Sequence, residues 1–579
     1  MLEAHPTRHE SREPSMVTAK RPDEWILSIH EDSNANATLF HHGTPVFAVA
    51  EERLTRVRFA AGFPKHAVQA CLDFAGIELD DVDVVVAGNQ THFLPRLTPN
   101  LVQDGDHDYF GLAHKAYLYF QGALASVRPL GWIAQWLGRE PLRRKVPRLA
   151  PFVDHHTAHA YSAYLTSGME NAVAITSDNM GDGYSSKVFS CADGRCSFLY
   201  GSPAHQSPGQ FYGEVAQFLG YHNLMAGKVT GLASYGDPEP GYPYMERLFQ
   251  LHPSKERFHL PELLLRRKRK GPYRELAALE PRDVAAAAQK RLEDVMVAYV
   301  EHAIKRTGHS NVVLAGGTFA NVVLNQRILD LEGVENIYVH PAMTDQGISM
   351  GAGLAYLGEQ GLATNQPLPN IYLGPGFSEE EIVAALHAAE LDFERPDDPA
   401  AAIADVLCDG KVVGHYHGRM EYGLRALGNR SIFYRPDDPA VNDWLNERLQ
   451  RSEFMPFAPV VLEEEAATCF HRVDGGILAG RYMTMTFDAQ PGFQEKAPGV
   501  VHIDGTARPQ FISREANART YDIIRHFFER TGIPCLVNTS FNMHSEPIVC
   551  TPENAIDAFR QSRLDILAIG PFIVRQPTD

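Results

Sequence analysis

The stretch Trp25-Ile-Leu-Ser-Ile-His30-Glu-Asp-Ser33 decides the fold, because its layout returns about 148 positions later in Ala172-Val-Ala-Ile-Thr-Ser-Asp178-Asn-Met-Gly-Asp-Gly183. Each stretch is an apolar strand that ends in a polar, acidic loop. In each copy two more strands are expected to follow, joined by a tight turn at Gly43 in the first copy and at Asp193-Gly194 in the second. A unit that occurs twice in one chain predicts two similar halves with a cleft between them.

A strand, an acidic loop, a strand, a turn and a strand, present twice, is the layout of the duplicated actin-like (ribonuclease-H-like) ATPase fold, in which phosphates and metal ions lie between the halves. Strands and helical stretches alternate from residue 23 to about residue 365, which predicts α/β architecture. The stretch from Gly361 to Gly376 is rich in Gly, Pro and Asn, which indicates a linker. We therefore expect an N-terminal domain over residues 23–366 and a second α/β domain over residues 367–579.

The length and charge of the chain narrow the class of protein. With 579 residues it exceeds what one hydrophobic core supports, so two or three domains are expected. It carries 53 Lys and Arg against 71 Asp and Glu, a net charge of −18 that argues against a nucleic-acid-binding surface. The single basic cluster, at residues 265–274, is interpreted as a solvated loop.

The chain shows no sign of a membrane or extracellular setting. No apolar run is long enough to span a bilayer, and residues 1–22 are expected to be a disordered tail rather than a signal peptide. The seven cysteines are scattered and odd in number, without a Cys-x-x-Cys motif. They indicate neither a disulfide framework nor a thiolate metal site, which fits a reducing cytoplasm.

An aromatic-rich insertion at about residues 92–148 interrupts the repeat, and it holds Trp132 and Trp136, two of the four tryptophans. Extra helices that pack on the core would explain it. The functional alternative is a lid over a substrate with substantial apolar surface, because aromatic walls bury area without demanding many polar partners. The sequence leaves both interpretations open.

A histidine pair suggests a metal site. His155 and His159 are four positions apart, so on a helix both rings project from one face and can share an ion. Asp178 and Asp345 each follow an apolar strand, where open α/β sheets present their ligand-binding groups. Two imidazoles and two carboxylates suit Fe(II), Mn(II) or Zn(II). The alternatives are surface histidines, and aspartates that act only as helix caps or turn residues.

Glycine-bearing loops follow several of the expected strands, at Gly181 and Gly183, at Gly316 and Gly317, and at Gly347. Glycine lets backbone N–H groups approach a phosphate closely, so these loops are candidates for nucleotide binding. Lys228, beside Gly227, is a further candidate. The segment around it is not a Walker A motif, because the required glycine spacing is absent.

The second domain contains a different type of motif. Residues 418–431 concentrate Arg419, Arg425 and Arg430 among turn-forming residues, and Arg508 follows in a later segment. Arginine forks recognise phosphate oxygens, so an anion pocket is predicted. Short polar groups join this set from Ser431 and from the segment that carries Asn538 and Ser540. A network of structural salt bridges is the alternative.

These motifs, taken together, resemble the O-carbamoyltransferases of the NodU/CmcH family. The matching segments run from His30 to Ile573 and include His155-His-Thr-Ala-His-Ala160, Asp345-Gln-Gly347, residues 418–431, His502 to Arg508 and Asn538 to Asn542. The resemblance implies an actin-like N-terminal domain joined to a YrdC-like C-terminal domain.

The resemblance also implies a reaction at two sites. Carbamoyl phosphate and ATP, with Mg(II), would form carbamoyl-adenylate in the C-terminal domain, and the carbamoyl group would pass to a hydroxyl beside a divalent metal, Fe(II) being expected. The acceptor would be a natural-product alcohol, as in antibiotic biosynthesis, and a homodimer is allowed for. The implied roles are as follows: phosphate binding by Arg419, Arg425, Arg430, Arg508 and Ser431; orientation of the carbamoyl group by Asn538 and Ser540; nucleotide binding by Lys228, Gly316, Gly317 and Gly347; metal binding by His155, His159, Asp178 and Asp345; and general base catalysis by His30.

Two departures from the family pattern and two rival functions remain. Many relatives have His-Asp and then small residues where this chain has His30-Glu-Asp-Ser-Asn34, so the shape of that loop is not settled, and a usual Lys is absent near Gln450. A small-molecule kinase could use the same N-terminal fold, but it would not need the arginine-rich domain. An ATP-switched binding module would not need the His155 and His159 pair.

Overall fold

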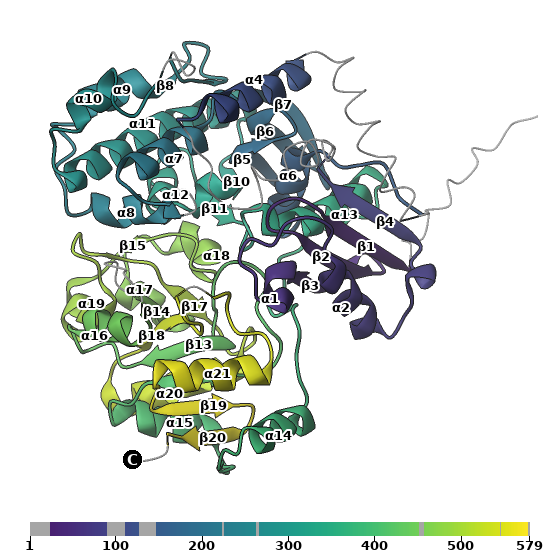
Figure 1. The fold of residues 1–579 in the computed structure, drawn as a ribbon, viewed down its shortest axis with the longest axis vertical. Helices are drawn as coiled ribbons and strands as arrows, with labels where there is room; N and C mark the ends of the chain where they lie inside the picture. Colours follow the sequence, from purple (N-terminus) through teal and green to yellow (C-terminus); the bar gives the residue numbers. More distant parts are fainter. Residues whose placement is uncertain are drawn as a thin grey trace, which may run out of the picture.

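The computed structural model describes residues 24–89, 110–126, 146, 148–222, 225–261, 266–450, 457–544 and 546–576. Two α/β parts make up the molecule, with the N-terminal domain in the upper half of Figure 1 and the C-terminal domain below it. The expected tail at residues 1–22, most of the insertion with Trp132 and Trp136, and residues 451–456 lie outside the described residues.

The first copy of the repeat forms a sheet with the strand order β3-β2-β1-β4. Its strands are β1 (Trp25–His30), β2 (Asn36–His41), β3 (Thr44–Ala50) and β4 (Val84–Gly88). β1 is antiparallel to β2 and parallel to β4, and isolated bridges at Leu149 and Val153 continue the sheet beyond β4. Helix α2 (Lys65–Ala75) covers its outer face.

The second copy repeats this order and these strand directions. Its sheet has the order β11-β10-β5-β6-β7, with β5 (Asn171–Gly181), β6 (Tyr184–Ala192), β7 (Arg195–Pro203), β10 (Asn311–Ala315) and β11 (Asn336–Val339). β5 is antiparallel to β6 and parallel to β10. Helices α7 (Pro208–Phe218) and α11 (Pro281–Thr307) pack on this sheet from outside. The expected duplication and α/β fold class are confirmed.

The turns explain why the hairpins form where the sequence indicates. His42 and Gly43 have φ values of 49° and 79°, and Asp193 and Gly194 have 52° and 74°. Two successive left-handed residues make the hairpin turn whose twist matches that of the strands, and Asp-Gly is a favoured pair for it. An Asp-Gly pair also forms the turn between β5 and β6, where Asp182 has a φ of 48°.

The two sheets of the N-terminal domain exchange helices. Helix α6 (His155–Leu165) follows the first sheet in the chain but packs on β5 and β10 of the second sheet. Helix α13 (Ile348–Glu359) follows the second sheet and packs on β1 and β4 of the first. The two helices also lie against each other, and a Cβ at Gly351 would be 1.9 Å from the carbonyl oxygen of Ala158.

The C-terminal domain is built on a seven-stranded mixed sheet with the order β17-β14-β18-β13-β12-β19-β20. The strands are β12 (Val413–Tyr416), β13 (Arg430–Tyr434), β14 (Ala458–Leu462), β17 (Gln510–Ile512), β18 (Cys535–Ser540), β19 (Ile566–Ile569) and β20 (Phe572–Arg575). Helices α15 (Pro399–Cys408) and α20 (Ala518–Thr531) pack together and cover it, as does α21 (Pro552–Ser562).

Buried side chains from both domains form one continuous apolar cluster, which extends from Val173 and Ile175 of β5 to Ile566 and Val574 near the C-terminus. The structure departs from the cysteine prediction, because Cys191 and Cys196 are cross-strand partners in the β6–β7 hairpin and are joined by a disulfide. The other five cysteines are free. Among the described helices, none combines the length and apolarity needed to cross a membrane.

Candidate active site

Helix α6 presents the two predicted histidines, and its first turn is firmly anchored. The N-cap residue Asp154 accepts the backbone N–H of Thr157 at 2.9 Å and binds the Lys187 ammonium group at 2.8 Å. The N–H of His155 donates to Asp182 Oδ2 at 2.7 Å. Carboxylates at a helix N-terminus satisfy its free N–H groups and complement its dipole. The β5–β6 turn, which carries Asp182, thus fixes the start of α6.

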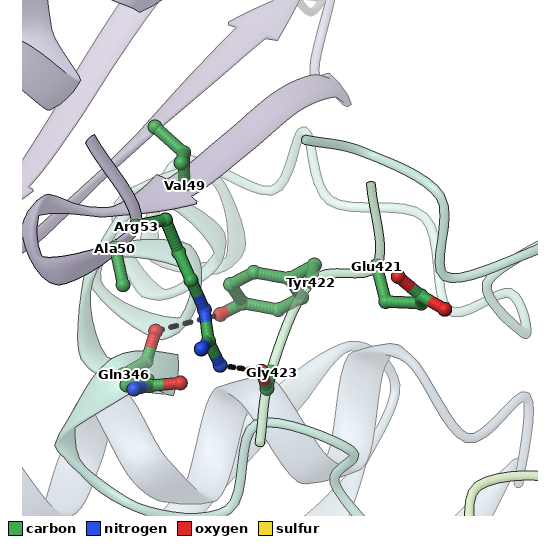
Figure 2. A pocket seen from close by; sticks show the side chains of 7 residues that line it. All are labelled: Val49, Ala50, Arg53, Gln346, Glu421, Tyr422 and Gly423. Atoms are coloured by element: carbon green, nitrogen blue, oxygen red, sulfur yellow. Dashed lines mark hydrogen bonds between the residues drawn. The ribbon is translucent and has the colours of Figure 1, made fainter. Parts of the chain in front are cut away.

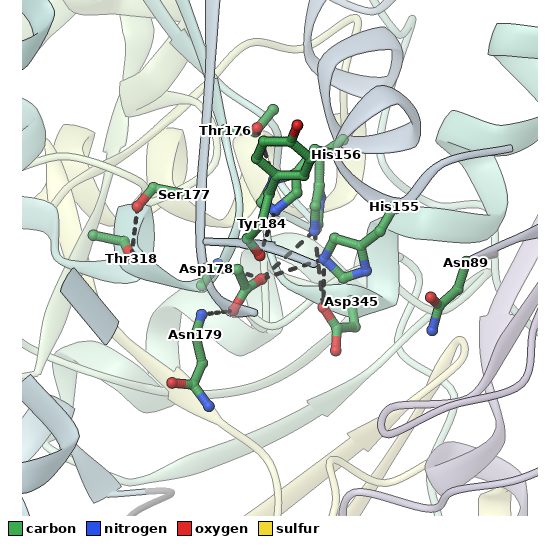
Figure 3. A network of polar contacts seen from close by, with 12 residues as sticks. Asn89, His155, His156, Thr176, Ser177, Asp178, Asn179, Tyr184, Thr318 and Asp345 are labelled. Atoms are coloured by element: carbon green, nitrogen blue, oxygen red, sulfur yellow. Dashed lines mark hydrogen bonds and ion pairs between the residues drawn. The ribbon is translucent and has the colours of Figure 1, made fainter. Parts of the chain in front are cut away.

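The four predicted metal-binding residues converge. One ligand atom from each of His155, His159, Asp178 and Asp345 lies within 4.8 Å of the others. His159 Nε2 is 3.6 Å from Asp178 Oδ2 and 3.8 Å from Asp345 Oδ1, and His155 Nε2 is 4.0 and 3.8 Å from the same atoms. Figure 3 shows these contacts meeting at the two carboxylates. Ligands about 2.1 Å from a tetrahedral ion lie roughly 3.4 Å apart, so the spacing matches a slightly open ion site.

The unsatisfied atoms of this cluster support a metal ion rather than a salt bridge. His155 and His159 are 2% and 0% exposed, yet neither ring makes a hydrogen bond through either nitrogen. Asp345 Oδ1 is also buried without a partner. Buried polar atoms normally find partners. Two imidazole nitrogens and two carboxylate oxygens are a donor set that divalent transition metals accept, so these residues fit such an ion.

The carboxylates of Asp178 and Asp345 accept hydrogen bonds from different parts of the domain. Asp178 lies where the β5–β6 register breaks between Ser177 and Gly181, and it accepts the N–H groups of Asn179 at 2.7 Å and Gly317 at 3.0 Å. Asp345 Oδ2 accepts the Ser33 hydroxyl at 3.1 Å. The sequence analysis missed Ser33, because only its distance to Asp345 in space reveals its role.

Electrostatics in the metal-free cluster are set by burial and by the paired charges. Burial opposes ionisation of His159, but its contacts with Asp178 and Asp345 raise its pKa to about 9. Burial and the charge of Asp178 raise the pKa of Asp345 to about 6. Burial lowers the pKa of His30 to about 3, so this imidazole is neutral at physiological pH. Its Nε2 is 3.2 Å from the Ser33 carbonyl oxygen, while Nδ1 has no hydrogen-bond partner.

The glycines predicted to bind phosphate serve close packing around the cluster. Gly316 has a φ of 104°, and a Cβ there would be 2.1 Å from the Ser177 carbonyl oxygen. The Gly317 N–H already donates to Asp178. A Cβ at Gly347 would be 2.3 Å from the Ala342 carbonyl oxygen. Lys228 lies in the first turn of α8 (Gly227–Ala233). Phosphate binding by these residues stays a prediction.

In the C-terminal domain, Arg425 and Arg508 are two half-buried cations, and the charge of Arg425 acts on Arg508. Burial lowers the pKa of Arg425 to about 10. Burial and the charge of Arg425 together hold the pKa of Arg508 well below its usual range. The buried Nε atoms of both side chains lack partners among the described residues. Two half-buried guanidinium groups that repel each other suit an anion, and anion binding by this pair stays a prediction.

Arg419 and Arg430 direct much of their hydrogen bonding to backbone carbonyls. The Arg430 side chain is 0% exposed, donates to the carbonyls of His417, Asn429, Pro375 and Gly418, and stacks on Tyr416 at 3.7 Å. Arg419 donates to the carbonyls of Gly374, Val46 and Leu373. Ser431 Oγ accepts the Gly428 N–H at 2.9 Å. Backbone carbonyls and an N–H group thus engage most polar atoms of these three side chains, although Arg430 Nε is buried without a partner, and phosphate binding by them stays a prediction.

The remaining polar residues of this pocket are arranged by the sheet. Asn538, on β18, donates to the Ala426 carbonyl at 3.2 Å and to Gln510 Oε1 at 2.8 Å, and its own Oδ1 is buried without a partner. Ser540 ends the same strand. Glu421, which the sequence analysis did not single out, accepts the N–H groups of residues 427, 429 and 430 on one carboxylate oxygen. An acid that precedes a turn-rich loop by a few residues is the signal that could have revealed it.

A small pocket lies between the domains, and its lining residues are neighbours in sequence of the metal-binding cluster and of the arginine pair. It is lined by residues of the N-terminal domain, among them Arg53 and Gln346, and by Glu421, Tyr422 and Gly423 of the C-terminal domain. Figure 2 shows the Arg53 guanidinium reaching the Gly423 carbonyl, at 3.1 Å, and the Tyr422 hydroxyl directed at the backbone of Gln346. Gln346 adjoins Asp345, and Gly423 precedes Arg425 by two positions.

Solved structures resemble this chain only distantly. Full-length HypF in its phosphate- and nucleotide-bound form is 15% identical, with a TM-score of 0.36 over 58% of this chain and 56% of that one. A ROK hexokinase from Thermus thermophilus is 12% identical, with a TM-score of 0.30 over 57% of this chain and 99% of that one. Similarity at this level carries no functional argument.

The similarity to protein families and curated sequences is much stronger. The model of the carbamoyltransferase N-terminus matches residues 26–354, and that of the carbamoyltransferase C-terminus matches residues 404–576. Nodulation protein NolNO of Sinorhizobium fredii is 33% identical over 96% of this chain and 82% of its own length. Nodulation protein NolO of Bradyrhizobium diazoefficiens is 36% identical over 73% of this chain and 79% of its own length. The resemblance seen in the sequence is thus confirmed: the chain belongs to the carbamoyltransferase family, and its reaction is carbamoyl transfer.

Proposed function

We propose that the protein forms carbamoyl-adenylate from carbamoyl phosphate and ATP in its C-terminal domain and transfers the carbamoyl group to a natural-product alcohol in its N-terminal domain. The observation that carries this proposal is the pair of half-buried guanidinium groups of Arg425 and Arg508, whose charges act on each other and whose buried Nε atoms lack partners. The family match favours it over a kinase or an ATP-switched binding module, because carbamoyl transfer already requires a carbamoyl donor.

The Arg425 and Arg508 pair suits a doubly charged group such as the phosphate of carbamoyl phosphate. Cations placed in advance where negative charge develops stabilise a transition state, and they do so strongly when water is excluded. The Oδ1 atom of Asn538, 2% exposed and unpartnered, can accept a hydrogen bond from the carbamoyl NH₂ group. The pocket therefore offers complementary groups for both ends of the donor.

The atoms of the proposed activation balance when one water enters. The carbamoyl–phosphate bond is broken by water, inorganic phosphate leaves, and the resulting carbamate oxygen attacks the α-phosphorus of ATP, with pyrophosphate as leaving group. The ATP is used with Mg(II). In the second step the acceptor oxygen displaces AMP from the carbamoyl carbon.

In the N-terminal domain, His155, His159, Asp178 and Asp345 would hold the divalent ion, which supplies Lewis-acid polarisation of a carbonyl oxygen when bound. We infer Fe(II) as the ion. His30 is neutral, and its Nδ1 carries the free lone pair because Nε2–H donates to the Ser33 carbonyl. His30 is thus the group that takes the proton of the acceptor hydroxyl.

The described part of the insertion supports an acceptor beside the metal-binding cluster. Helix α4 (Leu112–Ser126) is joined to α7 by a 2.8 Å hydrogen bond between His114 and Gln210. The N-cap of α7, Ser207, donates to the Asp178 carbonyl at 3.1 Å. Leu112 and Phe120 of α4 are exposed. An apolar helix tied to the metal-binding loop suits a partly apolar natural product.

The experiment separates the two steps. Release of pyrophosphate from ATP should depend on carbamoyl phosphate, and Arg508→Ala should abolish it. Arg514→Ala, which removes an exposed arginine paired with Asp522, is the matched control and should leave the release unchanged. If Arg508→Ala releases pyrophosphate as fast as the control variant, the activation site is placed wrongly.

The transfer step is tested with His30→Ala and a panel of hydroxylated natural products. This variant should retain carbamoyl-phosphate-dependent release of pyrophosphate and lose about 10²- to 10⁴-fold in product formation, the range that a general base contributes. A loss of pyrophosphate release in His30→Ala would contradict the division of labour between the domains.

A further inference from the structure

The loop after β1 reaches from the first half of the N-terminal domain to the metal-binding cluster. Ser33 donates its hydroxyl hydrogen to Asp345 Oδ2 at 3.1 Å, although 312 positions separate the two residues. Asp345 follows β11 in the second half of the N-terminal domain, whereas Ser33 follows β1 in the first half. Its hydrogen bond therefore spans the two halves.

Ser33 is itself held in place by a chain of hydrogen bonds. Its N–H donates to Asp32 Oδ1 at 2.8 Å, and Asp32 Oδ2 accepts the Asn89 amide at 3.1 Å. Asn89 directly follows β4, has a φ of 78°, and donates its own N–H to the Val153 carbonyl at 2.9 Å. These hydrogen bonds fix the backbone of Ser33 to Asp32, and Asp32 to the residue that follows β4, so the position of Ser33 beside Asp345 is held from the end of that strand.

The backbone of Asp345 is fixed from the same side. Asn36, at the start of β2, donates its amide to the Asp345 carbonyl at 2.9 Å and accepts the Ser349 N–H at 3.2 Å. Asn36 is fully buried. With its main chain held by Asn36 and its Oδ2 by Ser33, Asp345 keeps Oδ1 as the oxygen that faces both imidazoles at 3.8 Å.

Ser33 also contacts the proposed general base. Its carbonyl oxygen is 3.2 Å from His30 Nε2. One residue thus orients both a metal-binding carboxylate and the imidazole of His30.

We propose that Ser33, held by Asp32 and Asn89, is a positioning residue that sets the affinity of the N-terminal site for its divalent ion and aligns His30 with that ion. The proposal rests on the metal centre described under the proposed function. Partners that orient a metal-binding carboxylate from behind typically contribute 10- to 100-fold in metal affinity. The loop whose shape the sequence did not settle therefore controls the metal centre.

The test uses Co(II) as probe on the full-length protein, with binding followed by calorimetry and by the visible absorption of the ion. Ser33→Ala should bind Co(II) about 10- to 100-fold more weakly than the wild type, and Ser33→Thr, which keeps the hydroxyl, should recover most of the affinity. Ser28→Ala is the matched control, because Ser28 is a buried serine of β1, the strand before the Ser33 loop, and its hydroxyl has no partner. Equal affinities for Ser33→Ala and Ser28→Ala would overturn the proposal.

Three further variants keep the result interpretable. His159→Ala should abolish stoichiometric Co(II) binding. If it does so while Ser33→Ala binds normally, the positioning role fails and the metal site stands; if His159→Ala also binds normally, the metal site itself is wrong. Should Ser33→Ala not fold, Asp32→Ala removes the acceptor of the Ser33 N–H, and Asp32→Asn removes the same negative charge, which acts on Asp345, but keeps an oxygen acceptor; Asp32→Ala should bind Co(II) more weakly than Asp32→Asn. Equal affinities in Asp32→Ala and Asp32→Asn would likewise count against the proposal.

Discussion

The imidazole of His155 lies directly against the backbone of Gly181. A Cβ at position 181 would be 2.1 Å from its Cδ2, so no side chain fits without moving the ring. We expect Gly181→Ala to bind Co(II) at least about 10-fold more weakly, since a displaced ligand loses its geometry. Gly492→Ala is the control, because nothing lies within 4 Å of a Cβ there. Calorimetric titration of both variants checks this, and equal affinities would show that the ring can relocate.

Arg430 distinguishes a structural role from phosphate binding. Its guanidinium donates to four backbone carbonyls, those of residues 375, 417, 418 and 429, and is fully buried. Arg430→Met should therefore lower the free energy of unfolding by about 2–4 kcal/mol, because several carbonyls lose a charged donor. Urea unfolding measures this. The KM for carbamoyl phosphate should change far less in Arg430→Met than in Arg425→Lys, whereas a larger rise in Arg430→Met would restore the phosphate role.

At this scale the sequence predicts the metal-binding residues but not the use of each arginine. His155 and His159 share a helix face through their spacing alone, and Asp178 and Asp345 follow recognisable strands. The fate of a guanidinium depends instead on which distant carbonyls surround it. Arg419 donates to Val46, which lies 373 positions away, and no local pattern encodes that contact.

The packing of helix α6 against helix α13 brings metal-binding residues from distant parts of the chain together. α6 carries both histidines, and Asp345 lies just before α13. The helices touch where a Cβ at Gly351 would meet the Ala158 carbonyl at 1.9 Å, between the two histidines in the chain. Gly351→Ala should push the helices apart and weaken Co(II) binding. Overpacking should also lower the free energy of unfolding by about 1–3 kcal/mol.

The control for this change lies on a helix of the other domain. Ala558→Ser on α21 makes a small change at a buried helical position far from the cluster in sequence. It should leave Co(II) binding untouched even where stability falls. Weakened binding in both variants would mean that general destabilisation, not helix spacing, governs the site.

The elements themselves follow closely from the sequence, but their exchange between the sheets does not. Hairpins form where His42-Gly43 and Asp193-Gly194 supply two left-handed residues, and α11 ends at Gly308, which has a φ of 72°. These signals are local. The packing of α6 on β5 and β10 is not, because an apolar helix face fits either sheet and only the whole arrangement selects one.

At the scale of the whole molecule, the apolar cluster that runs through both domains predicts joint unfolding. Arg56 adds hydrogen bonds between the two domains, because it donates to the carbonyls of Ile548 and Pro547, both at 2.7 Å. Calorimetry should show one cooperative transition. Arg56→Ala should lower the Tm and keep the single transition, since the shared apolar core remains. Two separate transitions in the wild type would show that the domains are independent.

The exchanged helices of the N-terminal domain make each half depend on the other. One copy of the repeat on its own would leave bare the face of its sheet that the helix of the other copy covers here. Two chains that trade helices in this way form a two-fold, domain-swapped dimer, and the present domain holds the same arrangement within a single polypeptide. One half gives the histidines on its exchanged helix, and the other gives both aspartates, so the two halves contribute unlike ligands to the metal centre.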